Sequence, residues 1–344
     1  MSNTASNLEG TKVGQWNVLK KISKDGGTGG AFSSCYVVKS DDGNEAFLKA
    51  MNLEYAIRAT GGSTNRTAKL QELTSEYEQE KLLCETCGDK RLDRVVTAID
   101  WGELNPPNGL YFIPFIVFAL CKEGDVRRHA KMNEASLAWR LRVFHGVAVG
   151  LRQLHSIDIY HQDLKPSNIL INVGDEAKIA DLGRATTSAP GALHSGDGHW
   201  GDAGYVPIEL AYKHHESDAR IRRIAGDIYM LGGVLAYLVS NIEFLGKLLS
   251  ELPPAYHPRI WQGSYQDALP VVQSATFRVV DEIVVPLNPK LAEEVRTMLI
   301  WLCHPDPQKR GHPKTVTQAA GDRYSLERII TQADRIAHVA RRNS

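Results

Sequence analysis

Alternation of hydrophobic and polar residues predicts β-strands in the first third of the chain. It runs through residues 16–22, 34–40 and 47–51, and the turn sequence DDGN at 41–44 precedes the last of these. Residues 95–101 and 111–121 also indicate strands, separated by an Asn-Pro-Pro-Asn-Gly turn. A glycine-rich loop at 24–31 separates the first two strands. A helical pattern covers 69–87, so this part is predicted to be strand-rich with one helix.

The pattern changes to helix after Gly124. Apolar residues recur at spacings of three and four at 137, 141, 144, 148, 151 and 154, and further helices are predicted at 226–240, 290–303 and 325–341. We therefore expect an α+β protein with four parts. These are a flexible tail at 1–11, a strand-rich lobe at 12–120, a helical lobe at 121–320, and a C-terminal helix at 321–344 packed on or beside the helical lobe.

Composition and charge narrow the class of protein. The 344 residues carry 40 Lys+Arg and 40 Asp+Glu, and this balance disfavours a duplex-DNA binder that neutralises phosphates, so we expect no nucleic-acid partner. The longest apolar stretch, 111–121, is about half a membrane span, and the first ten residues are polar. Five scattered cysteines suit a reducing compartment. A cytoplasmic protein without a membrane partner is the expectation.

Two short motifs carry the chemistry. The segment His161-Gln-Asp-Leu-Lys-Pro-Ser-Asn follows the long predicted helix, and Asp181-Leu-Gly comes thirteen residues after Asn168. This ordered pair resembles the catalytic loop and the metal-binding DFG segment of protein kinases, here with Leu in place of Phe. The resemblance covers about residues 12–315 and implies a two-lobed protein-kinase-like fold, with a strand-rich N-lobe and a helical C-lobe.

The resemblance implies a role for each matching residue. Asp163 would orient the substrate hydroxyl and accept its proton, and Lys165 would neutralise charge on the γ-phosphoryl group. Lys49 in the sequence AFLKAM matches the lysine that contacts the α- and β-phosphates. Its partner would be Glu80 in the following helix, with Glu76 one turn earlier as the alternative.

The implied cofactors are ATP and Mg²⁺, with Mn²⁺ as an alternative metal. Asp181 and Asn168 would hold the metal through oxygen atoms, as this hard cation requires. The glycine-rich loop would cover the phosphates through backbone N–H groups at Gly27, Thr28, Gly29, Gly30 and Ala31. The resemblance places five further residues around the base and the hinge: Cys35, Phe118, Ala119, Cys121 and Asp125.

Other matches are structural. Glu209, near the end of the activation segment, would pair with Arg310, and Asp227 would be the buried aspartate of the next helix.

Three departures from the family's pattern stand close to the expected site. Phe47 occupies the position where the family has Ala above the adenine, and this ring would crowd the nucleotide. Gln162 replaces the Arg that pairs with an activation-segment phosphate. Asp202 replaces the Thr that hydrogen-bonds the catalytic Asp and Lys. Hydroxyls open to phosphorylation are expected at Thr186, Thr187, Ser188 and Ser195.

These observations predict a Mg·ATP-dependent serine/threonine protein kinase that phosphorylates a protein substrate. We expect its activity to be controlled by a regulatory protein partner, by a ligand or by the amount of the protein. One alternative is a pseudokinase that acts as a binding or scaffold module. Retention of Lys49, Asp163, Asn168 and Asp181 argues against it, whereas Phe47 and Asp202 argue for it. The other alternative is a small-molecule phosphotransferase of the aminoglycoside or choline type, which shares the catalytic-loop core.

Overall fold

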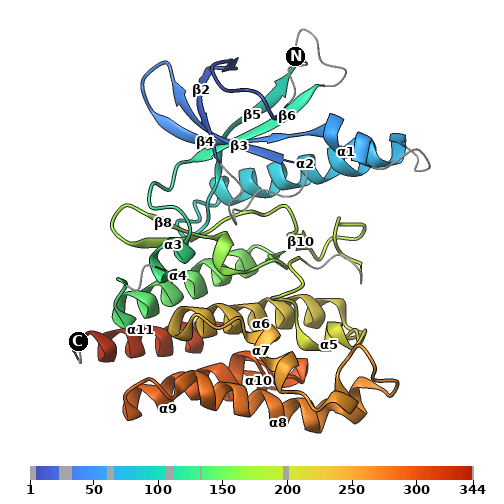
Figure 1. Ribbon diagram of the computed structural model, residues 1–344, viewed down its shortest axis with the longest axis vertical. Coiled ribbons are helices and arrows are strands. Elements are labelled where there is room, and N and C mark those ends of the chain that lie inside the picture. The colour runs from blue at the N-terminus through green and yellow to red at the C-terminus, as the bar shows by residue number, and fades with distance from the viewer. Residues whose placement is uncertain are drawn as a thin grey trace. The chain divides into compact units, whose positions relative to one another are not determined.

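The computed structural model describes residues 5–22, 33–59, 66–105, 112–131, 134–196 and 201–342. The chain divides into two compact units (Figure 1). Unit 1 comprises Met1–Lys122 with Ala180–Gly183, and unit 2 comprises Glu123–Ile179 with Arg184–Ser344. The short segment that contains Asp181 therefore belongs to the strand-rich unit, although it lies among residues of the helical unit in sequence.

An antiparallel sheet forms the body of unit 1, and its described strands have the order β1-β2-β3-β4-β6-β5. Its strands are β1 (Lys12–Val13), β2 (Trp16–Lys21), β3 (Ser33–Ser40), β4 (Glu45–Met51), β5 (Ala98–Leu104) and β6 (Ile113–Ala119). The predicted strands are confirmed, but β5 begins three residues later than expected. Isolated register shifts occur in the β2–β3 and β5–β6 pairs.

The alternation of β4 decides which side chains reach each face of the sheet. Ala46, Leu48 and Ala50 are fully buried in the core of unit 1, together with residues of β2, β3 and β6. Phe47 and Lys49 point to the opposite face, because successive side chains of a strand alternate. Both side chains are only partly buried, so this face of β4 is more accessible than the face that packs in the core.

Two helices complete unit 1: α1 (Leu53–Ala59) and α2 (Arg66–Asp89). Helix α2 is three residues longer at its start than predicted and two longer at its end, and it buries Leu73, Tyr77, Leu83, Cys84 and Cys87 along one face. Among these apolar neighbours it also buries the carboxyl-bearing Glu80, at 6% exposure. A buried acid requires a partner, and this is the first structural sign of a site.

The segment before β1 differs from the expected flexible tail. Ala5 and Leu8 are buried in the core of unit 1. The Tyr36 hydroxyl donates to the Ala5 carbonyl at 2.6 Å, and Asn52 Nδ2 donates to Ser6 Oγ at 2.7 Å. Polar composition concealed this packing, because two apolar side chains and backbone hydrogen bonds to distant strands hold the segment.

Helices dominate unit 2. They are α3 (Val126–Lys131), α4 (Leu137–Ser156), α5 (Ile208–Ala211), α6 (Ala219–Ser240), α7 (Phe244–Glu251), α8 (Tyr265–Val284), α9 (Pro289–Leu302), α10 (Pro313–Val316) and α11 (Glu327–Arg342). Short 3₁₀ turns lie at Pro166–Asn168, Pro254–Tyr256 and Pro307–Lys309. Helix α6 starts seven residues earlier than predicted, because Asp218 caps it by accepting from the backbone N–H groups of Arg220 and Ile221.

Helices α4 and α6 form the core of unit 2. Helix α6 is long and apolar enough to cross a membrane by length and composition, but 83% of its most apolar window is buried inside the protein. Helix α11 packs along α4 and also contacts α9 (Figure 1). Alanines at 333, 337 and 340 lie on its buried face, and Arg152 of α4 pairs with Glu327 at 3.0 Å.

Two short antiparallel pairs in unit 2 frame the loops that carry the motifs. Strand β8 (Ile169–Asn172) pairs with β9 (Glu176–Ile179), and β7 (Ile159–Tyr160) pairs with β10 (Thr186–Thr187). The catalytic-loop motif connects β7 to β8 directly. Its position is thus fixed at both ends by strands.

Candidate active site

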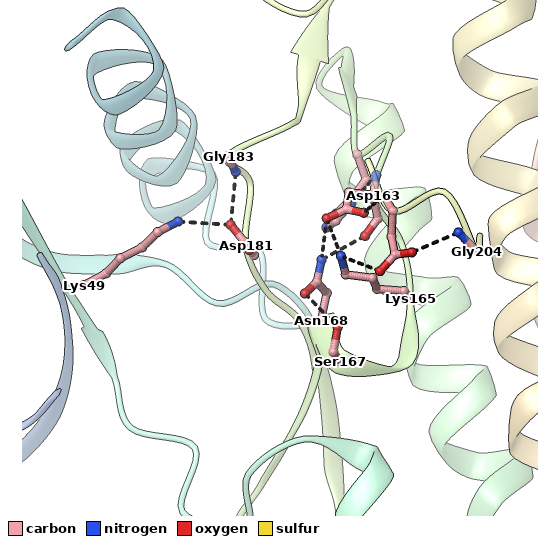
Figure 2. A network of polar contacts seen from close by, with 10 residues as sticks. Lys49, Asp163, Lys165, Ser167, Asn168, Asp181, Gly183 and Gly204 are labelled. Atoms are coloured by element: carbon pink, nitrogen blue, oxygen red, sulfur yellow. Dashed lines mark hydrogen bonds and ion pairs between the residues drawn. The ribbon is translucent and has the colours of Figure 1, made fainter. Parts of the chain in front are cut away.

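Unit 1 holds three charged residues in direct contact. Lys49 Nζ donates to the two Glu80 carboxylate oxygens at 2.7 and 2.9 Å. It also donates to Asp181 Oδ1 at 3.1 Å (Figure 2). Strand β4 supplies the lysine, α2 supplies the glutamate and the segment 180–183 supplies Asp181. Glu80, the first of the two candidates in this helix, is therefore a partner of Lys49.

One ammonium group is shared by two carboxylates in this cluster. Burial lowers the pKa of Lys49, but the charges of Asp181 and Glu80 outweigh burial and raise that pKa above its ordinary value. Burial, together with the Asp181 charge, raises the pKa of Glu80 against the pull of Lys49. When all three groups are ionised, two carboxylates face one ammonium, and the remaining negative charge favours a bound cation at Asp181.

The residues predicted to hold Mg²⁺ offer suitable donors. Asp181 presents a carboxylate that is 21% exposed, and its backbone φ of +65° is a left-handed conformation that few non-glycine residues adopt. Asn168 is fully buried in unit 2, and its Nδ2 donates to the Asp163 carbonyl at 2.8 Å. Its amide nitrogen is thereby engaged, which leaves the amide oxygen as the group suited to a metal. Both donors are oxygen atoms, so the residues present fit Mg²⁺.

Asp163 is the centre of a second polar cluster, in unit 2. Its Oδ2 accepts from Asn168 Nδ2 at 3.2 Å and pairs with Lys165 Nζ at 3.0 Å. Its Oδ1 accepts from the backbone N–H of Asp202 at 2.7 Å. Figure 2 shows these groups converging on the Asp163 carboxylate. These three contacts hold the Asp163 carboxylate in one orientation.

The backbone of Gly201 lies against Asp163. A Cβ atom built at Gly201 would be 2.0 Å from Asp163 Oδ1, far inside any real contact. The Gly201 N–H donates to the Gln162 carbonyl at 3.1 Å. Sequence reasoning missed this steric role, because the two glycines at 201 and 204 look equivalent in a loop and Asp163 is distant in sequence.

A buried carboxylate binds the backbone of the catalytic loop. Asp227 of α6 is fully buried and accepts from the backbone N–H groups of His161 and Gln162 at 2.8 Å each. His155 Nε2 lies 2.8 Å from the same carboxylate. Gln162 has a left-handed φ of +59°, so Asp227 stabilises a strained backbone immediately before Asp163. The contact with His155 was not predicted.

A buried ion pair anchors the far end of the activation segment. Arg310 is fully buried, and its Nη1 donates to Glu209 Oε1 at 2.8 Å, as the resemblance implied. Its Nε donates to the His304 carbonyl at 2.7 Å, and the guanidinium lies 4.7 Å from the centre of the Tyr229 ring. The pair is thus fully desolvated and hydrogen-bonded, the condition under which removing one partner is costly.

Two of the residues expected around the base, Cys35 and Phe118, lie on the same face of the unit 1 sheet as Lys49 and Phe47. Phe47 stands directly opposite Phe118 of β6, with the two ring centres 6.2 Å apart, and Cys35 of β3 stands opposite Lys49. Ala119, at the end of β6, is exposed, and Cys121 is half-buried. Phe47 therefore shares a face and a strand with Lys49.

The glycine-rich loop and Asp125 are the remaining predicted nucleotide contacts. Residues Gly27, Thr28, Gly29, Gly30 and Ala31 lie outside the described part of the chain. Asp125, in unit 2, accepts from Arg127 Nε at 2.8 Å and from Arg127 Nη2 at 2.9 Å. A nucleotide that used Asp125 would have to share this carboxylate with Arg127.

The described activation segment is held by local contacts. Thr186 is fully buried, and its hydroxyl donates to the Leu193 carbonyl at 2.6 Å, so it is not an accessible phosphorylation site. The Ser188 backbone N–H donates to Asp158 Oδ2 at 3.0 Å, and the Ser188 hydroxyl contacts the same oxygen. Gln162 Nε2 is buried and has no hydrogen-bond partner among the residues that the structure describes.

Comparison with known proteins agrees with this geometry. Residues 27–324 match the protein kinase domain family, and the chain belongs to that family. It has the family's two-lobed α+β fold, with unit 1 as the strand-rich lobe and unit 2 as the helical lobe.

Several relatives are plant receptor-like kinases. The leucine-rich repeat receptor-like serine/threonine/tyrosine-protein kinase SOBIR1 of Arabidopsis thaliana is 27% identical over 218 residues, which cover 55% of this chain and 33% of that protein. The probable LRR receptor-like serine/threonine-protein kinase RKF3 of the same plant is 37% identical over 37% of this chain and 20% of that protein. Phytosulfokine receptor 2 is 36% identical over 37% of this chain. The chain thus spans a third or less of the length of these relatives.

Proposed function

We propose that this protein is a Mg·ATP-dependent serine/threonine protein kinase that transfers the γ-phosphoryl group to a protein hydroxyl. The observation that carries the proposal is the Lys49–Glu80 ion pair at 2.7 Å, because protein kinases require this pair for catalysis. The serine/threonine class rests on Lys165 in the sequence DLKPSN. A cytoplasmic location and control by a partner protein are parts of the same proposal.

Each cluster has a distinct task in this reaction. Bound Mg·ATP would supply the phosphoryl group and neutralise its developing charge. Asp181 and Asn168 would hold the metal, and Lys49, fixed by Glu80, would orient the phosphates. Asp163 accepts the proton of the substrate hydroxyl, because its carboxylate is already oriented by its three donors.

Two alternatives are weaker. A pseudokinase would not need the fixed Asp163 carboxylate or the Lys49–Glu80 pair, and both are present. A small-molecule phosphotransferase would share the catalytic loop but usually lacks the Glu209–Arg310 pair, which is present and buried. The match over residues 27–324 also favours a protein kinase.

The test compares two chemically identical substitutions. Asp163→Asn should reduce phosphorylation of a generic acceptor protein by two or more orders of magnitude, because the general base is lost. Asp175→Asn is the matched control, since Asp175 is an exposed residue in the β8–β9 turn, and it should retain wild-type turnover. Calorimetric titration with Mg·ATP separates the alternatives: nucleotide binding without any phosphotransfer in wild type would identify a pseudokinase.

We further propose that phosphorylation of the activation segment is not needed for activity. The segment is ordered by the β7–β10 pair and by the Ser188–Asp158 contact. Gln162 is uncharged and cannot form the ion pair that an Arg would form with a phosphate. Arg184 is the residue that would replace it if this proposal were wrong. Simultaneous replacement of the accessible hydroxyl residues Thr187, Ser188 and Ser195 by Ala should keep activity within tenfold, or about 1.4 kcal/mol in the barrier. A larger loss with the fold intact would contradict it.

A further inference from the structure

The Lys165 ammonium lies between two carboxylates in unit 2. It is 3.0 Å from Asp163 Oδ2 and 3.4 Å from Asp202 Oδ2. The Asp163 side chain is 9% exposed, whereas that of Asp202 is 46% exposed. Lys165 is therefore not a free cation that faces an incoming phosphoryl group, because two negative charges already compete for it.

Asp202 is itself held in position. Its Oδ1 accepts from the Gly204 backbone N–H at 2.9 Å, and its own backbone N–H donates to Asp163 Oδ1 (Figure 2). The backbone contact would be kept by any residue at this position. The carboxylate is thus a separate feature, and the Thr that the family has here would bring a neutral hydroxyl instead.

Negative charge exceeds positive charge around the Asp202 carboxylate in the described structure. Lys165 pairs with both Asp163 and Asp202, so these three ionised groups together carry one net negative charge. Glu243, at the start of α7, lies close enough that a Cβ at Gly204 would clash with its Oε1. Burial raises the pKa of Glu243, and the charge of Asp202 adds to the effect. The negative charge here is in excess.

We propose that Asp202 is a positioning residue that holds Lys165 as its counter-ion and thereby slows phosphoryl transfer. This inference rests on the proposed function. During transfer the Lys165 ammonium must stabilise charge on the phosphoryl oxygens, and any share of it that remains with Asp202 is lost to that task. Asp202 also repels the anionic phosphoryl group directly. Both effects act on the chemical step.

The kinetic test uses substitutions that keep the backbone contact. Asp202→Asn keeps the shape and the acceptor for Gly204, and Asp202→Thr restores the family's residue. Each should raise kcat about tenfold at saturating Mg·ATP and leave KM for the acceptor protein within twofold. Glu243→Gln is the matched control, because it removes a nearby negative charge that has no ion pair with Lys165 in the described structure, and it should change kcat less than twofold.

Salt provides a readout that a merely structural role would not move. The Asp202 carboxylate is half exposed and is therefore screened by ions. Wild-type kcat should rise as ionic strength increases, whereas kcat of Asp202→Asn should stay flat or fall.

A second readout needs no catalysis. In nucleotide-free protein at mildly alkaline pH, the rate at which an amine-acylating reagent labels Lys165 is measured by peptide mass spectrometry, with the exposed Lys213 as internal standard. Asp202→Asn should label Lys165 several-fold faster than wild type, because the amine loses one of the two carboxylates that hold it in place. Labelling at the wild-type rate would overturn the assigned ion pair.

The outcomes separate this inference from the proposed function. Transfer by wild type together with an unchanged or lower kcat in Asp202→Asn would overturn the inference and leave the protein kinase assignment intact. No transfer by wild type or by either Asp202 variant would overturn the proposed function and this inference with it. Faster transfer by both variants, with faster labelling of Lys165, is the expected result.

Discussion

Gly201→Ala should disable Asp163, the proposed catalytic base, without unfolding the protein. The new Cβ would lie 2.0 Å from Asp163 Oδ1, 2.3 Å from its Cγ and 2.4 Å from its Cβ, whereas ordinary contact begins at 3.4 Å. Asp163 cannot move away cheaply, because Asn168, Lys165 and the backbone of Asp202 hold its carboxylate. The backbone at 201 and the Asp163 side chain must therefore separate by more than 1 Å, on the order of the misplacement that costs about 100-fold in rate.

The magnitude follows from that displacement. A 100-fold loss in kcat corresponds to about 2.7 kcal/mol in the barrier. It is measured as the initial rate of acceptor phosphorylation at saturating Mg·ATP, with thermal unfolding recorded for each variant. Since the clash is between one glycine and one side chain, the melting temperature should fall only modestly while kcat falls steeply.

Gly204→Ala is the control for this prediction. A Cβ at Gly204 would lie 2.2 Å from Glu243 Oε1, which looks almost as severe. That atom, however, is the far end of an exposed, flexible side chain that can rotate away. Gly204→Ala should therefore keep kcat within about threefold, because Asp163 is not displaced. Wild-type kcat in Gly201→Ala, or equal losses in the two variants, would refute the reasoning.

Three further predictions concern binding and stability. Phe47→Ala should tighten Mg·ATP binding in calorimetric titration, because it removes a ring beside Phe118 on the same face of the sheet as Lys49; unchanged or weaker binding would mean that the ring packs usefully on the base. Arg310→Met should lower the free energy of unfolding by about 3–5 kcal/mol in a denaturant titration, because it leaves a buried carboxylate unpaired, and a loss below about 1 kcal/mol would contradict this. Burial lowers the pKa of His304 to about 4, so the fold favours the neutral ring. This contribution to the free energy of unfolding is fully present above the unfolded-state pKa of about 6.5. It should be lost as the pH falls toward 4, by about 3 kcal/mol at most. His304→Asn should remove this part of the pH dependence.

Local patterns predicted much of unit 1. The alternation of β4 puts Lys49 on the face opposite Leu48, as the period of two in a strand requires. The acid partner of Lys49, by contrast, was implied by the resemblance to protein kinases, with Glu80 first and Glu76 as the alternative. The identity of the acid was less certain, because positions one turn apart share a helix face; only the packing of α2 showed that Glu80 contacts Lys49.

Contacts between distant segments could not be predicted in the same way. The burial of Ala5 and Leu8 depends on Tyr36 and on strands that follow later in the chain. The burial of Thr186 depends on how its segment returns at Leu193. In each case a polar or short stretch looks exposed by composition, and its environment is decided by residues that no local pattern links to it.

The central proposal is a metal-dependent phosphoryl transfer to a protein hydroxyl that requires the Asp181 carboxylate. The most direct measurement incubates wild type and Asp181→Ala with Mg·ATP and an acceptor protein and maps every phosphosite by mass spectrometry. The account predicts phosphoserine and phosphothreonine on the acceptor with wild type, and a loss of orders of magnitude with Asp181→Ala or after chelation of the metal. Wild-type turnover in Asp181→Ala, or tight nucleotide binding by wild type with no phosphorylated product, would contradict it.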